Sequence, residues 1–157
     1  MIPEAQHKKL DLQERKKVLV VDDNEDALTL EKILFEEVGF VACEAKNASD
    51  GIAIAKKEKP DVIIMDMRLP DMPGIEAAKL LRQDEETCCI PILFVTGSVM
   101  PGEIRDLELA AISNTALISK PINTLTFAKD VTDFMNVKHM LDLTAKRAII
   151  EKLRVRN

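Results

Sequence analysis

The chain alternates short apolar runs with longer stretches in which apolar residues recur at helical spacing. The apolar runs are rich in β-branched residues and show no polar alternation, which is typical of strands buried on both faces of a sheet. They are Val18–Val21, Phe40–Ala42, Val62–Met65, Ile90–Val95 and Ala116–Ile118. We predict a strand at each, and none is long enough to cross a membrane as a helix.

The stretches between these runs predict five helices, two of which begin at a proline, a residue that suits the first helical turn. They are Glu25–Val38, Ser49–Lys59, Pro73–Gln83, Pro101–Ala111 and Thr124–Met135. In the first, the residues assigned to one apolar face are Leu28, Leu30, Ile33, Leu34 and Val38. Five strands alternating with five helices predict an α/β fold, a parallel sheet covered by helices on both faces.

Two segments fall outside the alternation, so we expect a domain at residues 17–136, an N-terminal extension at 1–16 and a tail at 137–157. The tail predicts an extra basic helix whose apolar positions do not keep a heptad. We interpret it as an extension of the last helix or a linker to a further domain. A helix that dimerises or docks a partner is the alternative.

Charge is distributed unevenly along the 157 residues, whose net charge is −5. Residues 17–136 carry 12 basic and 22 acidic side chains, a balance of −10, whereas 137–157 carry 6 basic and 2 acidic, a balance of +4. Because an acidic surface repels phosphates, we expect no direct nucleic-acid binding by the domain.

The cysteines Cys43, Cys88 and Cys89 include an adjacent pair but no CxxC spacing, which argues against a disulfide framework or a zinc site. The adjacent pair could be a redox switch, but packed small residues are the favoured interpretation. The N-terminus lacks the apolar segment of a secretory signal. We therefore expect a cytoplasmic protein.

Polar residues follow four of the predicted strands. Asp22 and Asp23 follow the first, Asp66 the third, Thr96 the fourth and Lys120 the fifth. Taken singly, each has an ordinary explanation, such as a helix cap, a turn residue or a solvated lysine. Because ligands bind beyond the carboxyl ends of the strands in open parallel sheets, we expect the five side chains at one site.

Such a site has a definite electrostatic requirement. Carboxylates within ~4 Å of one another repel by about 4 kcal/mol per pair at an effective dielectric of ~20, so they need a cation or must take up protons. Oxygen ligands without histidine or cysteine suit Mg²⁺. With Lys120 as a second cation and Thr96 as a hydroxyl donor, the set predicts phosphoryl transfer to a carboxylate.

The motifs VLVVDDNED, DVIIMDMRLPDMPG, ILFVTG and LISKPI together resemble the receiver domain of bacterial two-component response regulators, chemotaxis regulators among them. The resemblance covers roughly residues 17 to 136. Each motif alone is weak, but their joint spacing is highly specific. The resemblance implies the strand order 2-1-3-4-5. It also implies a signalling protein that undergoes self-phosphorylation and slow autodephosphorylation but turns over no outside substrate.

The resemblance assigns roles to the residues around the metal. Asp66 accepts a phosphoryl group from the phosphohistidine of a sensor histidine kinase or a phosphotransfer protein. Asp23 binds Mg²⁺ directly, Asp22 binds it through water, and Arg68 supplies its backbone carbonyl.

On the phosphoryl side, the resemblance implies that Lys120 pairs with a phosphoryl oxygen and that Thr96 donates its hydroxyl. It also implies a cis Lys120–Pro121 bond. The implied output is a changed affinity for a protein partner at the surface of the fourth helix, fifth strand and fifth helix. That face, or the tail helix, could also form a homodimer.

Two positions depart from the family pattern. Leu117 stands where an aromatic residue usually switches position, and the segment before the fifth strand lacks the usual Gly-Ala, so Asn114 is the expected left-handed residue. Two alternatives stay open. One is a pseudo-receiver that binds partners without phosphorylation, and the other, disfavoured because no segment is long enough for a cap domain, is an Mg²⁺-dependent phosphohydrolase.

Overall fold

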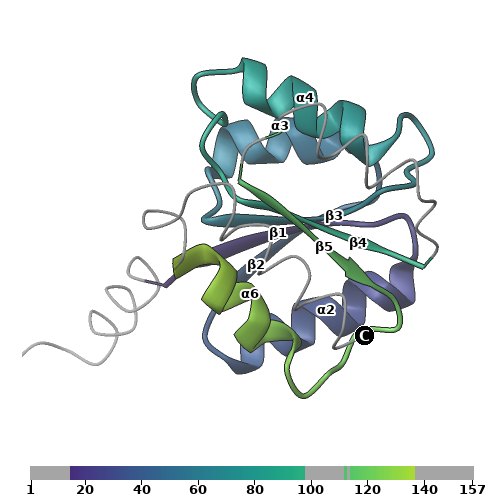
Figure 1. Cartoon of the computed structure of the whole chain (residues 1–157), viewed down its shortest axis with the longest axis vertical. Helices are drawn as coiled ribbons and strands as arrows, with labels where there is room; N and C mark the ends of the chain where they lie inside the picture. Colours follow the sequence, from purple (N-terminus) through teal and green to yellow (C-terminus); the bar gives the residue numbers. More distant parts are fainter. Residues whose placement is uncertain (1–14, 98–111, 113, 137–157) are drawn as a thin grey trace, which may run out of the picture.

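The computed structural model describes residues 15–97, 112 and 114–136. In these residues, a five-stranded parallel sheet lies between two pairs of helices (Figure 1). The strands are β1 (Lys17–Val21), β2 (Val41–Ala45), β3 (Val62–Asp66), β4 (Ile92–Thr96) and β5 (Thr115–Ser119). The helices are α2 (Glu25–Glu37), α3 (Ala48–Glu58), α4 (Gly74–Gln83) and α6 (Phe127–Asn136).

The observed strand order, β2-β1-β3-β4-β5, confirms the predicted α/β class and topology. Four of the five predicted helices are among the described residues. The predicted helix Pro101–Ala111, most of the extension 1–16 and the tail 137–157 lie outside them. None of the helices in the described ranges combines the length and apolar character needed to span a bilayer.

The two faces of the sheet are packed with different side chains. Helices α2 and α6 cover one face (Figure 1), where Phe35 makes edge-to-face contacts with Phe40 and Phe127 at centroid distances of 5.3 and 5.4 Å. Helices α3 and α4 cover the other face through several alanines and Gly51. A Cβ at Gly51 would lie 2.9 Å from Val21 Cγ2. Helix α3 can therefore pack this close to the sheet only because residue 51 has no side chain.

An asparagine side chain begins each of the first two helices. The Asn24 side chain accepts a hydrogen bond from the Ala27 N–H at 2.9 Å, and the Asn47 side chain accepts one from Asp50 at 2.8 Å. Such caps satisfy N–H groups that have no partner within the helix. Because Asn24 supplies the cap of α2, the capping explanation for Asp22 and Asp23 is not needed.

The inner face of α2 differs from the predicted one. Leu28, Glu31 and Phe35 are buried against the sheet, whereas three residues assigned to the apolar face are exposed: Leu30 by 41%, Ile33 by 47% and Val38 by 58%. The pattern was misread because a glutamate occupies a buried position.

Other predicted details were confirmed or shifted. Asn114 has a φ of 59°, as expected for the residue before β5, and the Lys120–Pro121 bond is cis. The second strand begins at Val41, not Phe40, and continues to Ala45. As an edge strand it tolerates polar residues such as Glu44, which an apolar run could not reveal.

Candidate functional site

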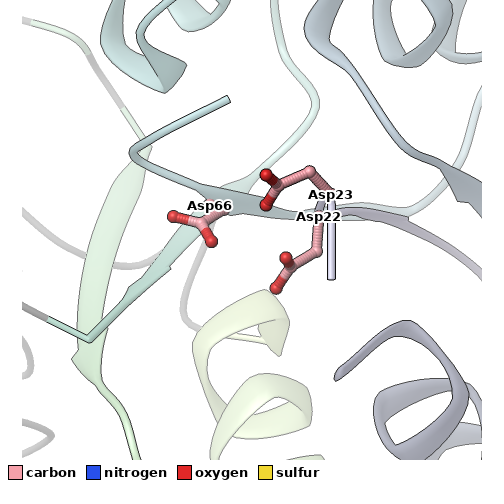
Figure 2. Close-up of side chains that lie close together, drawn as sticks. All are labelled: Asp22, Asp23 and Asp66. Carbon is pink, nitrogen blue, oxygen red and sulfur yellow. The ribbon is translucent and has the colours of Figure 1, made fainter. Parts of the chain in front are cut away.

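The sheet brings the three predicted aspartates together. Strands β1 and β3 are parallel neighbours in which Val21 pairs with Met65, so the next residues, Asp22 and Asp66, lie side by side. One carboxylate oxygen from each of Asp22, Asp23 and Asp66 lies within 4.8 Å of the others (Figure 2). We call this cluster the acidic edge.

Lys120 joins the acidic edge from the end of β5. Its Nζ donates to Asp22 Oδ2 at 2.7 Å and to Asp66 Oδ2 at 3.3 Å, and its backbone N–H donates to the Thr96 carbonyl at 2.7 Å. Burial lowers the pKa of Lys120, but the hydrogen bond and charge of Asp22 outweigh that effect and the net shift is upward. The ammonium is therefore held as a cation between two carboxylates.

Asp66 is the last residue of β3. Its Oδ1 accepts the Arg68 N–H at 3.0 Å. Partial burial raises the pKa of Asp66, and the Arg68 N–H and the Lys120 charge only partly offset this rise. A carboxyl group whose negative charge is not fully stabilised by its surroundings is typical of a functional site, and its charged form would be stabilised by an additional cation.

The remaining predicted residues lie at the same edge of the sheet. Thr96, 2% exposed, ends β4, the strand next to β3. Arg68 follows β3 in the loop to α4, where it forms an isolated antiparallel bridge with Pro73. The roles of the Thr96 hydroxyl and the Arg68 carbonyl stay predictions.

Glu31 is a buried acid that the sequence analysis did not single out. It is 2% exposed, and its carboxyl group forms no hydrogen bond or ion pair within the described part of the chain. Burial, and next the charge of Asp22, raise the pKa of Glu31 to about 8. With Lys120 and Pro121 it lines a pocket of about 400 Å³. The sequence offered one signal of its burial: Glu31 lies three residues after Leu28 and four before Phe35, and therefore on the same face of the helix.

The loop between β3 and α4 is fixed at two points that sequence reasoning also missed. At its tip, the Asp71 carboxylate accepts the N–H groups of Ala48 and Ser49 at 2.9 and 2.8 Å and the Ser49 hydroxyl at 2.7 Å. These bonds lower the pKa of Asp71 to about 2. At its base, a Cβ on Gly74 would lie 2.3 Å from the Asp66 carbonyl oxygen, so only glycine fits.

The donor set at the acidic edge fits a hard divalent cation. The three side chains offer only carboxylate oxygens, and their separation matches what one ion could bridge. Asp66 is the last residue of β3, whereas Asp22 and Asp23 lie between the end of β1 and Asn24, the N-cap of α2. Mg²⁺ suits such a site because it needs few protein ligands and keeps several waters.

Comparison with known proteins gives concordant results. A family model, the response regulator receiver domain, matches residues 18–132. The polar-differentiation response regulator DivK of Brucella anthropi is 32% identical over 120 residues, which cover 76% of this chain and 96% of the relative. The Vibrio cholerae chemotaxis protein CheY4 superposes with a TM-score of 0.70 at 28% identity, covering 76% of this chain and 98% of that structure.

A more distant structure shares the fold. The receiver domain of the sensor histidine kinase PA1611 from Pseudomonas aeruginosa superposes with a TM-score of 0.69 at 21% identity, covering 78% of this chain and 98% of that domain. That domain was solved with a magnesium ion coordinated in its active site cleft.

Proposed function

This chain belongs to the response regulator receiver domain family, and from that premise we propose that it accepts a phosphoryl group on Asp66. The donor is the phosphohistidine of a histidine kinase or a phosphotransfer protein in two-component signalling. The receiver unit comprises residues 17–136, and the basic tail links it to an output or extends its last helix.

The observation that carries this proposal is the position of Asp66, whose carboxylate accepts a hydrogen bond from Lys120 and has an oxygen within 4.8 Å of the carboxylates that follow β1. In the transfer, an Asp66 oxygen attacks phosphorus while the phosphorus–nitrogen bond of the donor breaks, and its electron pair leaves with the imidazole. Lys120 then exchanges a carboxylate partner for a phosphoryl oxygen. Because its ammonium is already at the site, little reorganisation is required.

Asp22, Asp23, Asp66 and the carbonyl of Arg68 would hold Mg²⁺. Once bound, the ion neutralises charge on the transferring phosphoryl oxygens. Two features of the protein support this assignment. The pKa of Asp66 is raised by burial, so a cation would relieve an existing cost, and the tethered β3–α4 loop keeps Arg68 near β3.

The response to phosphorylation would begin at Thr96, whose hydroxyl would donate to the new phosphoryl group. Leu117 on β5 is 2% exposed and pairs with Phe94 of β4, so it is part of the core beside Thr96. We infer that the output is a repacking of this surface that changes affinity for a protein partner or a second copy of the chain. The phosphate is lost slowly to water, with no turnover of outside substrates.

The test is intact-protein mass spectrometry after incubation with acetyl phosphate or phosphoramidate, with Mg²⁺ or with a chelator. We expect a single phosphoryl adduct that requires Mg²⁺ and is absent from Asp66→Asn. Asp61→Asn is the matched control, because Asp61 lies just before β3 and outside the acidic edge. It should be phosphorylated like the wild type.

The same experiment separates the alternatives. A folded wild-type protein without any adduct would identify a pseudo-receiver that binds its partners unphosphorylated. Rapid multiple turnover of the small donors would instead support a phosphohydrolase. An adduct of equal yield in Asp66→Asn would overturn the assignment of the acceptor.

A further inference from the structure

The turn between α4 and β4 holds two cysteine side chains against each other. The sulfurs of Cys88 and Cys89 are 3.3 Å apart and share a hydrogen bond. Adjacent residues in a strand point to opposite faces, so sequence neighbours do not meet in this way by default. Cys88 is half-buried and Cys89 is exposed, so a reagent in solution would meet Cys89 first.

The turn is held by contacts that do not involve the thiols. The buried Thr87 hydroxyl donates to the Leu81 carbonyl at 2.7 Å, and the Thr87 N–H donates to the Asp84 carbonyl at 3.1 Å. The Ile90 N–H closes the turn on the Thr87 carbonyl at 3.3 Å. The two sulfurs are therefore brought together by the fold.

A guanidinium lies close enough to the cysteine pair to act on it electrostatically. Arg82 lies in the last turn of α4, and its positive charge acts to lower the pKa of Cys88. In turn, the charges of Cys89 and Cys88 act to raise the pKa of Arg82 against the larger opposing effect of burial. The hydrogen bond with Cys89 and burial have the larger effect on Cys88 and raise its pKa overall. Cys88 therefore favours its protonated form, and the exposed Cys89 is the thiol that a reagent meets first. A partly exposed thiol beside a guanidinium is the usual setting of a reactive cysteine.

We propose that Cys88 and Cys89 form a thiol-modification site that closes to a vicinal disulfide by exchange with a low-molecular-weight disulfide such as oxidised glutathione. The Cys89 thiolate attacks one sulfur of the small disulfide and expels the first small thiolate. Cys88 then loses its proton to solvent, attacks the Cys89 sulfur and expels the second. The two protein thiols lose two electrons, and the small disulfide becomes two thiols.

The product would be readily reversible. Adjacent Cα atoms are about 3.8 Å apart, below the roughly 4.4–6.8 Å of ordinary disulfides. The ring is therefore strained, and strained disulfides have more oxidising potentials and are easily reduced. This property suits a sensor of thiol redox state better than a structural crosslink.

The turn also contacts the entrance of β5. The Asn114 side chain donates to the Cys89 carbonyl at 3.2 Å, and Arg82 Nη2 donates to the Asn114 carbonyl at 3.2 Å. Asn114 directly precedes β5, the strand that Lys120 directly follows. Closing the ring changes the backbone torsions at Cys89, whose carbonyl accepts the Asn114 hydrogen bond, and so disturbs this contact.

The test combines oxidised glutathione, alkylation of the remaining thiols and intact mass with peptide mapping, on the folded full-length chain. In the wild type we expect a product 2 Da lighter in which only Cys43 is alkylated, fully restored by dithiothreitol. Cys88→Ser should stop at a glutathione adduct on Cys89, and Cys89→Ser should react at least about tenfold more slowly. Cys43→Ser, the matched control, should behave like the wild type.

Three results would overturn the proposal: a stable glutathione adduct on wild-type Cys89, disulfide-linked dimers as the main product, or reaction at Cys43 ahead of the pair. The same reaction in urea shows whether the fold is responsible, because the unfolded chain should lose the preference for Cys89. None of these outcomes depends on phosphorylation of Asp66.

Discussion

The acidic edge and the tip of the β3–α4 loop both hold carboxyl groups, but their surroundings act in opposite directions. At the loop tip, Asp71 accepts three hydrogen bonds from the start of α3, and its pKa falls to about 2. Beside the acidic edge, Glu31 is buried without a hydrogen-bond partner among the described residues, and its pKa rises to about 8.

The difference lies in what each carboxylate receives in exchange for water. N–H donors at a helix N-terminus stabilise the charged form of Asp71. At Asp66 and Glu31, burial and the charge of Asp22 oppose the charged form, and Lys120 is shared between Asp22 and Asp66. The unfavourable electrostatics is therefore concentrated where the proposed function introduces a divalent cation.

The largest effect on stability should come from a substitution at the base of the β3–α4 loop, which connects the acidic edge to the loop tip. Gly74→Ala would place a Cβ 2.3 Å from the Asp66 carbonyl oxygen, a backbone atom that cannot easily move. We expect a loss of about 3 kcal/mol in the free energy of unfolding, the upper end of the usual cost of overpacking. Gly97→Ala is the control, because its Cβ would meet no atom within 4 Å, and it should change stability by less than about 0.5 kcal/mol.

Both variants can be followed by urea unfolding with far-ultraviolet circular dichroism, since the chain contains neither Trp nor Tyr. Equal stabilities for the two glycine variants would show that the loop base is not constrained as described.

The second effect concerns Glu31. The folded protein binds the Glu31 proton more tightly than the unfolded chain, where the pKa is near 4.5. The stability that it contributes is therefore complete below pH 4.5 and is lost as pH rises through about 8. The linkage limit is about 5 kcal/mol, and we expect roughly 2–3 kcal/mol after structural relaxation.

Glu31→Gln should remove this pH dependence between pH 5 and 9, whereas Glu37→Gln, at an exposed position on the same helix, should retain it. Urea unfolding at several pH values makes the measurement. A wild-type protein whose pH dependence matched that of Glu31→Gln would contradict the burial of an uncompensated acid.

How far the sequence determined these features depends on the residue. The apolar runs located the strands of the sheet, and the rule for strand ends located Asp22, Asp66, Thr96 and Lys120. Glu31 was missed because a polar residue interrupts the apolar pattern that identifies an inner face. The Asp71 bonds and the meeting of Cys88 with Cys89 depend on loop geometry, which no periodicity encodes.

The third effect, at Asp71, has the opposite pH sign. Its folded pKa of about 2 lies below the ordinary 3.8, so its contribution to stability is complete above about pH 4 and is lost as pH falls toward 2. Asp71→Asn should lack this acid-dependent loss. We also expect faster amide exchange at Ala48 and Ser49 and Mg²⁺ affinity weakened by roughly tenfold, because the loop carries Arg68.

Asp84→Asn is the matched control, because Asp84 also accepts a local N–H, that of Glu86, but lies outside this loop. It should leave Mg²⁺ affinity unchanged. A tenfold loss of affinity in both variants would point to a general effect of charge and not to positioning of the loop.

The smallest effect should come from a surface ion pair. Lys129 and Asp133 are joined at 2.9 Å on α6, but their side chains are 71% and 58% exposed. Asp133→Asn should cost less than about 0.5 kcal/mol and lose even that at high salt. A cost comparable to that of Gly74→Ala would show that surface charge, not the acidic edge, dominates the electrostatics of this protein.

The central claim is that Asp66, and no other carboxylate of the acidic edge, receives the phosphoryl group. Borohydride reduction after phosphorylation with acetyl phosphate and Mg²⁺ converts an aspartyl phosphate into homoserine, which peptide mass spectrometry locates. The account predicts homoserine at position 66 alone. Homoserine at position 22 or 23, or none despite a phosphoryl adduct on the intact protein, would contradict it.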